Sequence, residues 1–206
     1  MNKNEFFIEE FDKIVKNIRN CKTDVYLIGI AGPPGCGKTT IGKMLEKTLE
    51  NSILLPLDGY HKYLVDLDEN QKKRRGSPET FNLIKFKEDI LKLKINKRGL
   101  FPDFDHAKKD PEENKIEVKE THKFIIIEGL YLFLNELNIV NLFDIKIFVE
   151  CSDDDMFKRL IKRHISAGIV NNEIDAFDKV KNNDKVNKEY IMNNTIIDQS
   201  FIMIKT

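Results

Sequence analysis

The residues best suited to chemistry are the eight at positions 32–39, which read Gly-Pro-Pro-Gly-Cys-Gly-Lys-Thr. They match the pattern G-x-x-x-x-G-K-[ST], in which a glycine-rich turn lets backbone amides surround phosphate groups. Lys38 is expected to neutralise charge on the β and γ phosphates, and the Thr39 hydroxyl to bind the magnesium ion that bridges them. The sequence therefore predicts a site for a nucleoside triphosphate and Mg²⁺.

The backbone of this turn is expected to supply most of the phosphate contacts. Gly32 opens the turn, while Pro33 and Pro34 have no amide hydrogen to donate. The amides that remain would point at the phosphates from the positive end of the following helix. They belong to Gly35, Cys36, Gly37, Lys38, Thr39 and Thr40.

Short apolar runs of the kind that form buried parallel strands position this turn and its neighbours. They cover residues 25–30, 53–57, 124–127 and 145–149, and the last two are each followed by a helical pattern. Helices are also expected after Thr39, from Leu83 to about Leu93 with Asn82 as cap, and from Ser152 to about Ala167. Residues 116–119 alternate as an exposed strand would. Strands that alternate with helices predict a parallel sheet.

Two carboxylates follow predicted strands, at the sheet edge where ligands bind in α/β proteins. Asp58 could accept a proton from an attacking hydroxyl group, or Asp58-Gly59 could be an ordinary turn. Glu128 ends the run Phe-Ile-Ile-Ile and could reach magnesium or its water shell. The four apolar residues that precede Glu128 argue against a solvated surface position for it.

Other polar residues are open to two interpretations. Arg159 and Arg163 share a helical face and could clamp the transferring phosphate, or they could form an exposed basic face. His61, Asp105 and His106 could line an acceptor pocket or be loop residues with local hydrogen bonds.

The bulk composition limits the possible partners. The 206 residues contain 34 Lys plus Arg and 34 Asp plus Glu, so no overall field favours nucleic acid or a membrane. Three cysteines in no metal-ligand spacing indicate a reduced, cytoplasmic compartment. Cys36 could be oxidised or alkylated, or be a small filler residue. No secretory leader is recognisable, and the longest apolar stretch is too short to span a bilayer.

These segments, in this order, resemble the P-loop kinases that include uridine kinase, phosphoribulokinase and bacterial-type pantothenate kinase. The resemblance spans about residues 25–190. It rests on Asp-Gly-Tyr-His at 58–61, Arg-Arg-Gly-Ser-Pro-Glu-Thr-Phe at 74–81 and Ile-Glu-Gly-Leu at 127–130. The segments 101–106, 159–164 and 183–187 are similar to a smaller branch of nucleoside or nucleotide kinase-like proteins of uncertain substrate. Uridine kinases usually carry a hydroxyl residue where Gly59 stands.

The resemblance implies a role for particular residues. Asp58 would be the base, Glu128 would lie near the metal, and residues 159–163 would belong to a lid over ATP. Arg75 and His106 would lie on the acceptor side. Asn183 and Asn187 would lie near the nucleotide base.

We therefore expect a three-layer α/β sandwich of the P-loop NTPase type, with a mostly parallel central sheet and a helical lid. Residues 1–206 would form one domain, with an amphipathic helix over residues 1–22 and the lid over about 153–170. The expected activity is transfer of the γ-phosphoryl group of ATP to an alcohol of a small metabolite. Lys38, Arg159 and Arg163 would stabilise the transferring charge. The alternative is a slow ATPase that acts as a nucleotide-dependent switch or assembly factor.

Overall fold

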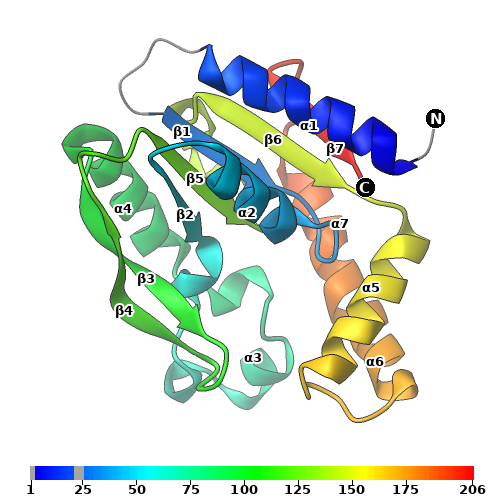
Figure 1. The fold of residues 1–206 in the computed structure, drawn as a ribbon. Coiled ribbons are helices and arrows are strands. Elements are labelled where there is room, and N and C mark those ends of the chain that lie inside the picture. The colour runs from blue at the N-terminus through cyan, green and yellow to red at the C-terminus, as the bar shows by residue number, and fades with distance from the viewer. Residues whose placement is uncertain (1–2, 21–25) are drawn as a thin grey trace.

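Figure 1 shows the computed structural model, which describes residues 3–20 and 26–206, with side chains described for residues 11–20 and from residue 27 onward. A five-stranded sheet runs through its centre in the order β2-β5-β1-β6-β7. All four strand pairs are parallel, which confirms the mostly parallel sheet predicted from the sequence. The strands are β1 (Tyr26–Ala31), β2 (Ser52–Pro56), β5 (Phe124–Gly129), β6 (Ile145–Glu150) and β7 (Phe201–Lys205).

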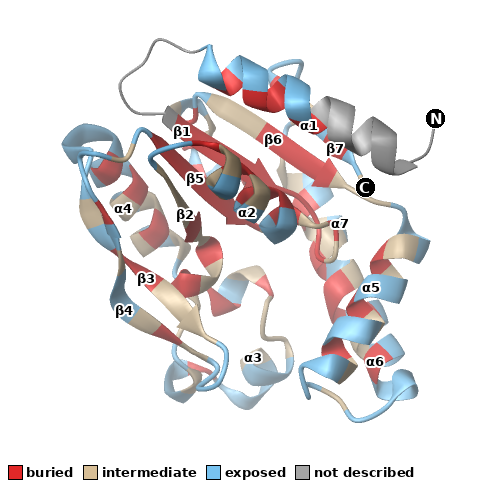
Figure 2. Cartoon of the chain, in the orientation of Figure 1, coloured by how far each residue is buried: buried red, intermediate tan, exposed pale blue. Residues whose placement is uncertain are grey.

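Helices cover both faces of this sheet and complete a three-layer arrangement (Figure 1). The helices α1 (Lys3–Arg19) and α2 (Lys38–Thr48) bury apolar residues against one face. On the other face lie α4 (Leu83–Asn96) and α7 (Lys185–Asn194), together with the chain that follows β5. Figure 2 shows the burial in the central strands, and every residue of β5 is buried. None of the helices within the described ranges is long and apolar enough to cross a membrane.

Two smaller units extend from the sandwich. The strands β3 (Gly99–Asp105) and β4 (Asp110–Val118) form an antiparallel hairpin. The helix α5 (Asp153–Ser166) follows β6 and packs against α6 (Glu173–Lys179), which continues through a π-helical turn (Val180–Asp184) into α7. Near the hairpin lies the short helix α3 (Glu69–Lys73) (Figure 1).

Several predicted elements are confirmed with small shifts. Asn82 and Ser152 cap α4 and α5 through their side chains, and Gly168 adopts a positive φ just after α5. The second strand ends at Pro56, because Leu57 already begins a 3-10 turn (Leu57–Tyr60). The exposed strand predicted at residues 116–119 is the end of the longer strand β4.

The helix predicted after residues 124–127 is wrong. That stretch contains two 3-10 turns, Asn135–Leu137 and Val140–Leu142. Its four consecutive residues from Tyr131 to Leu134 are each no more than 1% exposed. A helix at the sheet surface needs a solvated side, and residues 131–134 have none because they are buried in the core.

Candidate active site

The phosphate-binding turn lies between β1 and α2, where the sequence predicts it. Gly32, Gly35 and Gly37 have φ values of +146°, +73° and +89°, a region that side chains with a Cβ rarely adopt. A Cβ on Gly32 would lie 2.0 Å from the carbonyl oxygen of Val149 in β6. Gly37 is the N-cap of α2. The turn therefore presents backbone amides at a helix N-terminus, as phosphate binding requires.

Lys38 is buried beneath this turn, and its Nζ donates to the Pro33 carbonyl oxygen at 2.7 Å. Burial lowers the pKa of the Lys38 amine, and the negative charge of Glu128 partly offsets that effect. Arg163 lowers the same pKa, whereas Asp58 raises it. The charges of both predicted carboxylates and of Arg163 thus act on Lys38.

Glu128 is the next-to-last residue of β5 and pairs in register with Ile30 of β1 and Pro56 of β2. It is 5% exposed, and its Oε1 accepts a hydrogen bond from the Thr39 hydroxyl at 2.9 Å. Burial raises the pKa of the Glu128 carboxyl, and the charge of Asp58 raises it further. The two carboxylates therefore lie near each other at the carboxyl ends of neighbouring strands.

The donor set at this edge fits a magnesium ion. Mg²⁺ bound together with phosphates needs only one or two protein oxygen ligands. The adjacent oxygens of Thr39 and Glu128 could provide them. Within the described ranges no cluster of three or more His, Cys, Asp or Glu side chains forms a separate metal site.

Three residues predicted on the acceptor side gather around the aromatic ring of Phe104 in β3. Phe104 itself was not predicted as a site residue. The ring centroid of His61 lies 4.9 Å from that of Phe104, and the His106 centroid lies 5.2 Å from it. The Arg75 guanidinium lies 5.6 Å from the same centroid. His61 Nδ1 is 2.9 Å from the Asp58 carbonyl oxygen, which connects this cluster to the predicted base. Burial lowers the pKa of His61.

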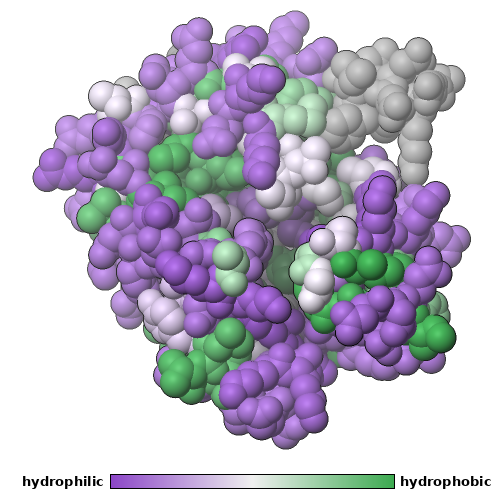
Figure 3. Space-filling model, turned by 60° about the horizontal axis from the view of Figure 1, so that its bottom comes forward, coloured by the Kyte–Doolittle hydropathy of each residue, from purple (hydrophilic) through white to green (hydrophobic). Residues whose placement is uncertain are grey.

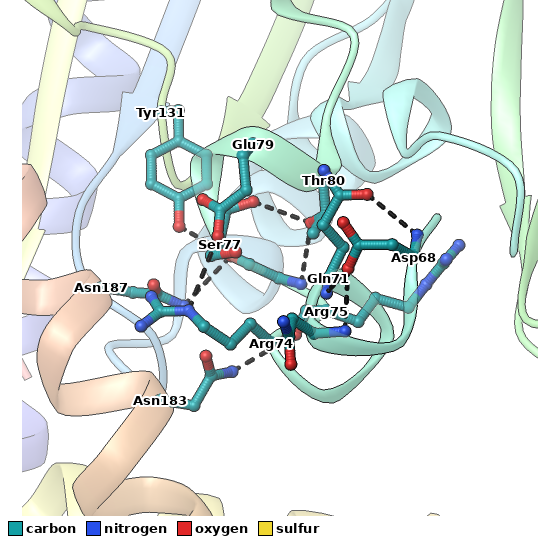
Figure 4. Close-up of polar contacts among 12 residues, drawn as sticks. Asp68, Gln71, Arg74, Arg75, Ser77, Glu79, Thr80, Tyr131, Asn183 and Asn187 are labelled. Carbon is teal, nitrogen blue, oxygen red and sulfur yellow. Dashed lines mark hydrogen bonds and ion pairs between the residues drawn. The ribbon is translucent and has the colours of Figure 1, made fainter. Parts of the chain in front are cut away.

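The segment Arg-Arg-Gly-Ser-Pro-Glu-Thr-Phe at residues 74–81 is held by hydrogen bonds from Tyr131 and from two asparagines of the π-helical turn and α7 (Figure 4). The Tyr131 hydroxyl donates to the Gly76 carbonyl oxygen at 2.6 Å, and Asn187 Nδ2 donates to the same oxygen at 3.1 Å. Asn183 Nδ2 donates to the Arg75 carbonyl oxygen at 3.3 Å. The structure therefore brings Asn183 and Asn187 to this segment, while their role beside a nucleotide base stays a prediction.

A pocket of about 350 Å³ opens beside this segment, lined among others by Arg74, Glu79, Asn187 and Tyr190. Several buried polar atoms nearby have no hydrogen-bond partner in the described part of the chain. They are Arg74 Nε, Arg75 Nε and Nη1, Ser77 Oγ, Asn183 Oδ1 and Asn187 Oδ1. Unpaired buried donors and acceptors are costly unless a ligand pairs with them. Figure 3 shows a face of the molecule that is hollowed near its middle, with both hydrophilic and hydrophobic side chains around the hollow.

The helix α5 lies on the opposite side of the phosphate-binding turn. Arg159 Nη1 donates to the Gly35 carbonyl oxygen at 3.3 Å and to the Thr206 hydroxyl at 2.8 Å. Arg163, one turn further along, is exposed and acts electrostatically on Lys38. Arg159 thus lies beside the turn, and Arg163 shares its face of α5. His164, which the sequence analysis did not select, is buried and pairs with Asp184 at 2.8 Å, joining α5 to the π-helical turn.

The sequence reasoning missed Phe104, Tyr131 and Tyr190. An aromatic residue in a short polar strand gives little indication that it organises a site. Tyr131 comes two residues after Gly129, the last residue of β5, so the same argument from the strand end that selected Glu128 could also have pointed to it.

The fold and the phosphate-binding turn define a P-loop kinase, and comparison with known proteins assigns the family. Residues 27–174 match the model of the Phosphoribulokinase / Uridine kinase family, and the chain belongs to that family. It is an ATP-dependent small-molecule kinase.

Relatives support this assignment over most of the chain. The "Putative uridine kinase C227.14" of Schizosaccharomyces pombe is 32% identical over 186 residues, covering 82% of this chain and 79% of that protein. The uridine kinase of Borrelia hermsii is 31% identical over 143 residues, which are 69% of this chain and 68% of that protein. The crystal structure of a "putative fructose transport system kinase" from Silicibacter sp. TM1040 superimposes with a TM-score of 0.81 at 25% identity, covering 98% of both chains.

Proposed function

We propose that this chain transfers the γ-phosphoryl group of ATP to a hydroxyl group of a small metabolite, with Asp58 as the base. What supports the proposal is the arrangement at one edge of the sheet. Glu128 of β5 pairs in register with Pro56, the last residue of β2, and Asp58 follows Pro56 by two residues. Thr39, which donates to Glu128, and Lys38 begin α2 at the same edge, so a carboxylate there would lie near the transferring group.

In the proposed reaction each of these residues has a separate role. The acceptor oxygen attacks the γ phosphorus, its proton passes to a carboxylate oxygen of Asp58, and the bond to the β-phosphate oxygen breaks. Lys38, Arg159 and Arg163 stabilise the negative charge, because phosphoryl transfer depends mainly on positioning and electrostatics. Thr39 and Glu128 would hold a magnesium ion, which neutralises charge on the phosphates when bound.

The acceptor is proposed to enter between the hairpin and the segment at residues 74–81. Asp58 is joined to the hairpin side through His61 and Phe104. Arg75 carries two buried guanidinium nitrogens without partners in the described part of the chain, so it can donate hydrogen bonds to an acceptor oxygen. We propose that α5, within the predicted lid over residues 153–170, closes the site from the other side.

Acceptor-dependent ADP release tests the proposal. ADP formation is measured with ATP and Mg²⁺ alone and then with a panel of hydroxyl compounds that includes pantothenate, uridine, cytidine, sugars and sugar phosphates. The proposal expects one class to raise the rate strongly and to gain a phosphate, detected by mass spectrometry. A flat, low rate across acceptors from every class would favour the alternative, a slow ATPase that hands phosphate to water.

A further inference from the structure

Two cysteines lie in contact beside the phosphate-binding turn. The Sγ atoms of Cys36 and Cys151 are 2.9 Å apart, although 115 positions separate the residues in sequence. Both are free thiols. Cys36 is fully buried within the turn, whereas Cys151 is partly exposed. A covalent bond between them needs the two sulfur atoms to approach to about 2.05 Å, a shift of less than about 1 Å.

The positions of the two residues show which parts of the chain such a bond would join. Cys36 belongs to the turn whose amides are expected to hold the phosphates, and its carbonyl oxygen accepts from the Thr206 hydroxyl at 3.1 Å. Cys151 stands between the end of β6 and Ser152, the N-cap of α5. A bond between them would join the phosphate-binding turn to the base of the helix that carries Arg159.

The surroundings of the two thiols shift their pKa values in opposite directions. A hydrogen bond to Cys151, together with burial, raises the pKa of Cys36. The same hydrogen bond lowers the pKa of Cys151 to about 7, and the positive charges of Arg159 and Lys188 act in the same direction. The thiolate is the reactive form towards oxidants. The more exposed of the two sulfurs is therefore also the more reactive one.

We propose that Cys36 and Cys151 form a redox modification site, at which a hydroperoxide produces an intrachain disulfide between the phosphate-binding turn and the base of α5. In the first step the Cys151 thiolate attacks a peroxide oxygen, the O–O bond breaks, and a sulfenic acid forms with release of hydroxide or alkoxide. In the second step the sulfur of Cys36 displaces the sulfenic oxygen, which leaves as water with the thiol proton. The sulfur pair loses two electrons and the peroxide gains them.

The disulfide is expected to slow turnover. Lid movements limit the rate of many enzymes that close over their substrates. A bond at the base of α5 ties its arginines to the turn and restricts such movement. This consequence rests on the proposed function, whereas formation of the disulfide does not.

Intact-mass measurement tests the site directly. The third cysteine, Cys21, lies outside the described residues and is removed by Cys21→Ser to give a two-cysteine background. After brief treatment with hydrogen peroxide, this variant should lose the mass of two hydrogen atoms, and peptide mapping should find Cys36 joined to Cys151. Dithiothreitol should restore the original mass. The matched variant Cys21→Ser/Cys151→Ser should show no such loss.

Activity provides the second readout. The cross-linked protein is expected to release ADP at least about tenfold more slowly than the reduced protein, with recovery after dithiothreitol. Addition of oxygen atoms to Cys151 without a cross-link would overturn the proposal, as would an unchanged mass under conditions that oxidise a model thiol. Because the cross-link is measured by mass, failure of this proposal is distinguishable from failure of the kinase assignment.

Discussion

Replacing Gly59 with alanine adds a methyl group where the backbone beside Asp58 meets the hairpin. A Cβ at this position would lie 2.4 Å from the carbonyl oxygen of Pro102 and 3.0 Å from the amide nitrogen of Asp103. Ordinary contact begins near 3.4 Å, so the two backbones must separate by about 1 Å. This steric limit gives a physical reason for glycine at position 59, because β3 occupies the space that a side chain there would need.

The expected size of the effect follows from that separation. A misplacement of about 1 Å in a reacting group lowers the rate roughly 100-fold. Overpacking of this kind costs about 2 kcal/mol, which for a chain of this length lowers Tm by roughly 4–8 °C. We therefore expect Gly59→Ala to reduce acceptor-dependent ADP release about 100-fold. The Kd for ATP, measured by calorimetry, should change less than about threefold, because the phosphate-binding turn belongs to a different segment.

Gly99→Ala is the matched control. Gly99 begins the same hairpin, but a Cβ there would meet only the side-chain ring of Phe101, at 3.0 Å. It should leave turnover within about threefold of the unsubstituted chain, because that contact involves a side chain away from Asp58. Full activity and an unchanged Tm in Gly59→Ala would refute the reasoning. Equal losses of ATP affinity and turnover would also refute it, because the damage would then extend beyond the acceptor side.

Three further predictions concern other parts of the site. Burial raises the pKa of Glu128 above its ordinary value of 4.5, so the carboxyl group stabilises the fold most at low pH and this contribution is lost as pH rises. The unfolding free energy of the unsubstituted chain minus that of Glu128→Gln, from urea titrations, should therefore fall as pH rises from 4.5; a difference that is flat or rises with pH would contradict this. Tyr131→Phe removes the hydrogen bond to Gly76, which should lower the free energy of unfolding by about 1 kcal/mol. It should also raise KM for the acceptor with little change in kcat, and a loss of kcat alone would argue against this prediction. Arg163→Ala should lower kcat about 100-fold at unchanged Tm, whereas its exposed neighbour Lys162→Ala should not; equal effects of the two would assign Arg163 to a general basic surface.

The sequence was most informative where one physical requirement dominates. The phosphate-binding turn needs glycine at positive φ and a strand and helix on either side, and all of these are found. The caps Asn82 and Ser152 marked two helix starts, because a side chain that accepts from a backbone amide can be recognised locally. The placement of Asp58 and Glu128 followed from the parallel order of the strands.

The parts that the sequence did not predict depend on tertiary contacts. The hairpin was largely missed, since β4 alternates weakly and carries many charged residues, and its pairing with β3 is not a local property. Residues 179–194 are rich in lysine and asparagine, which favours no particular element, yet they form the π-helical turn and α7. There Asn183 and Asn187 are buried because they hydrogen-bond to the segment at residues 74–81, so helical apolar spacing is weak. The edge strand β7 was not recognised either.

Substitution of Asp58 by asparagine tests the central claim most directly, because it keeps the shape of the side chain and removes only its ability to accept a proton. ATP affinity by calorimetry and acceptor-dependent transfer are measured on the same preparation. The account predicts a Kd within about threefold of the unsubstituted chain and a transfer rate lower by about 10² to 10⁴, the range that a general base contributes. Transfer to the same acceptor at an undiminished rate would contradict it.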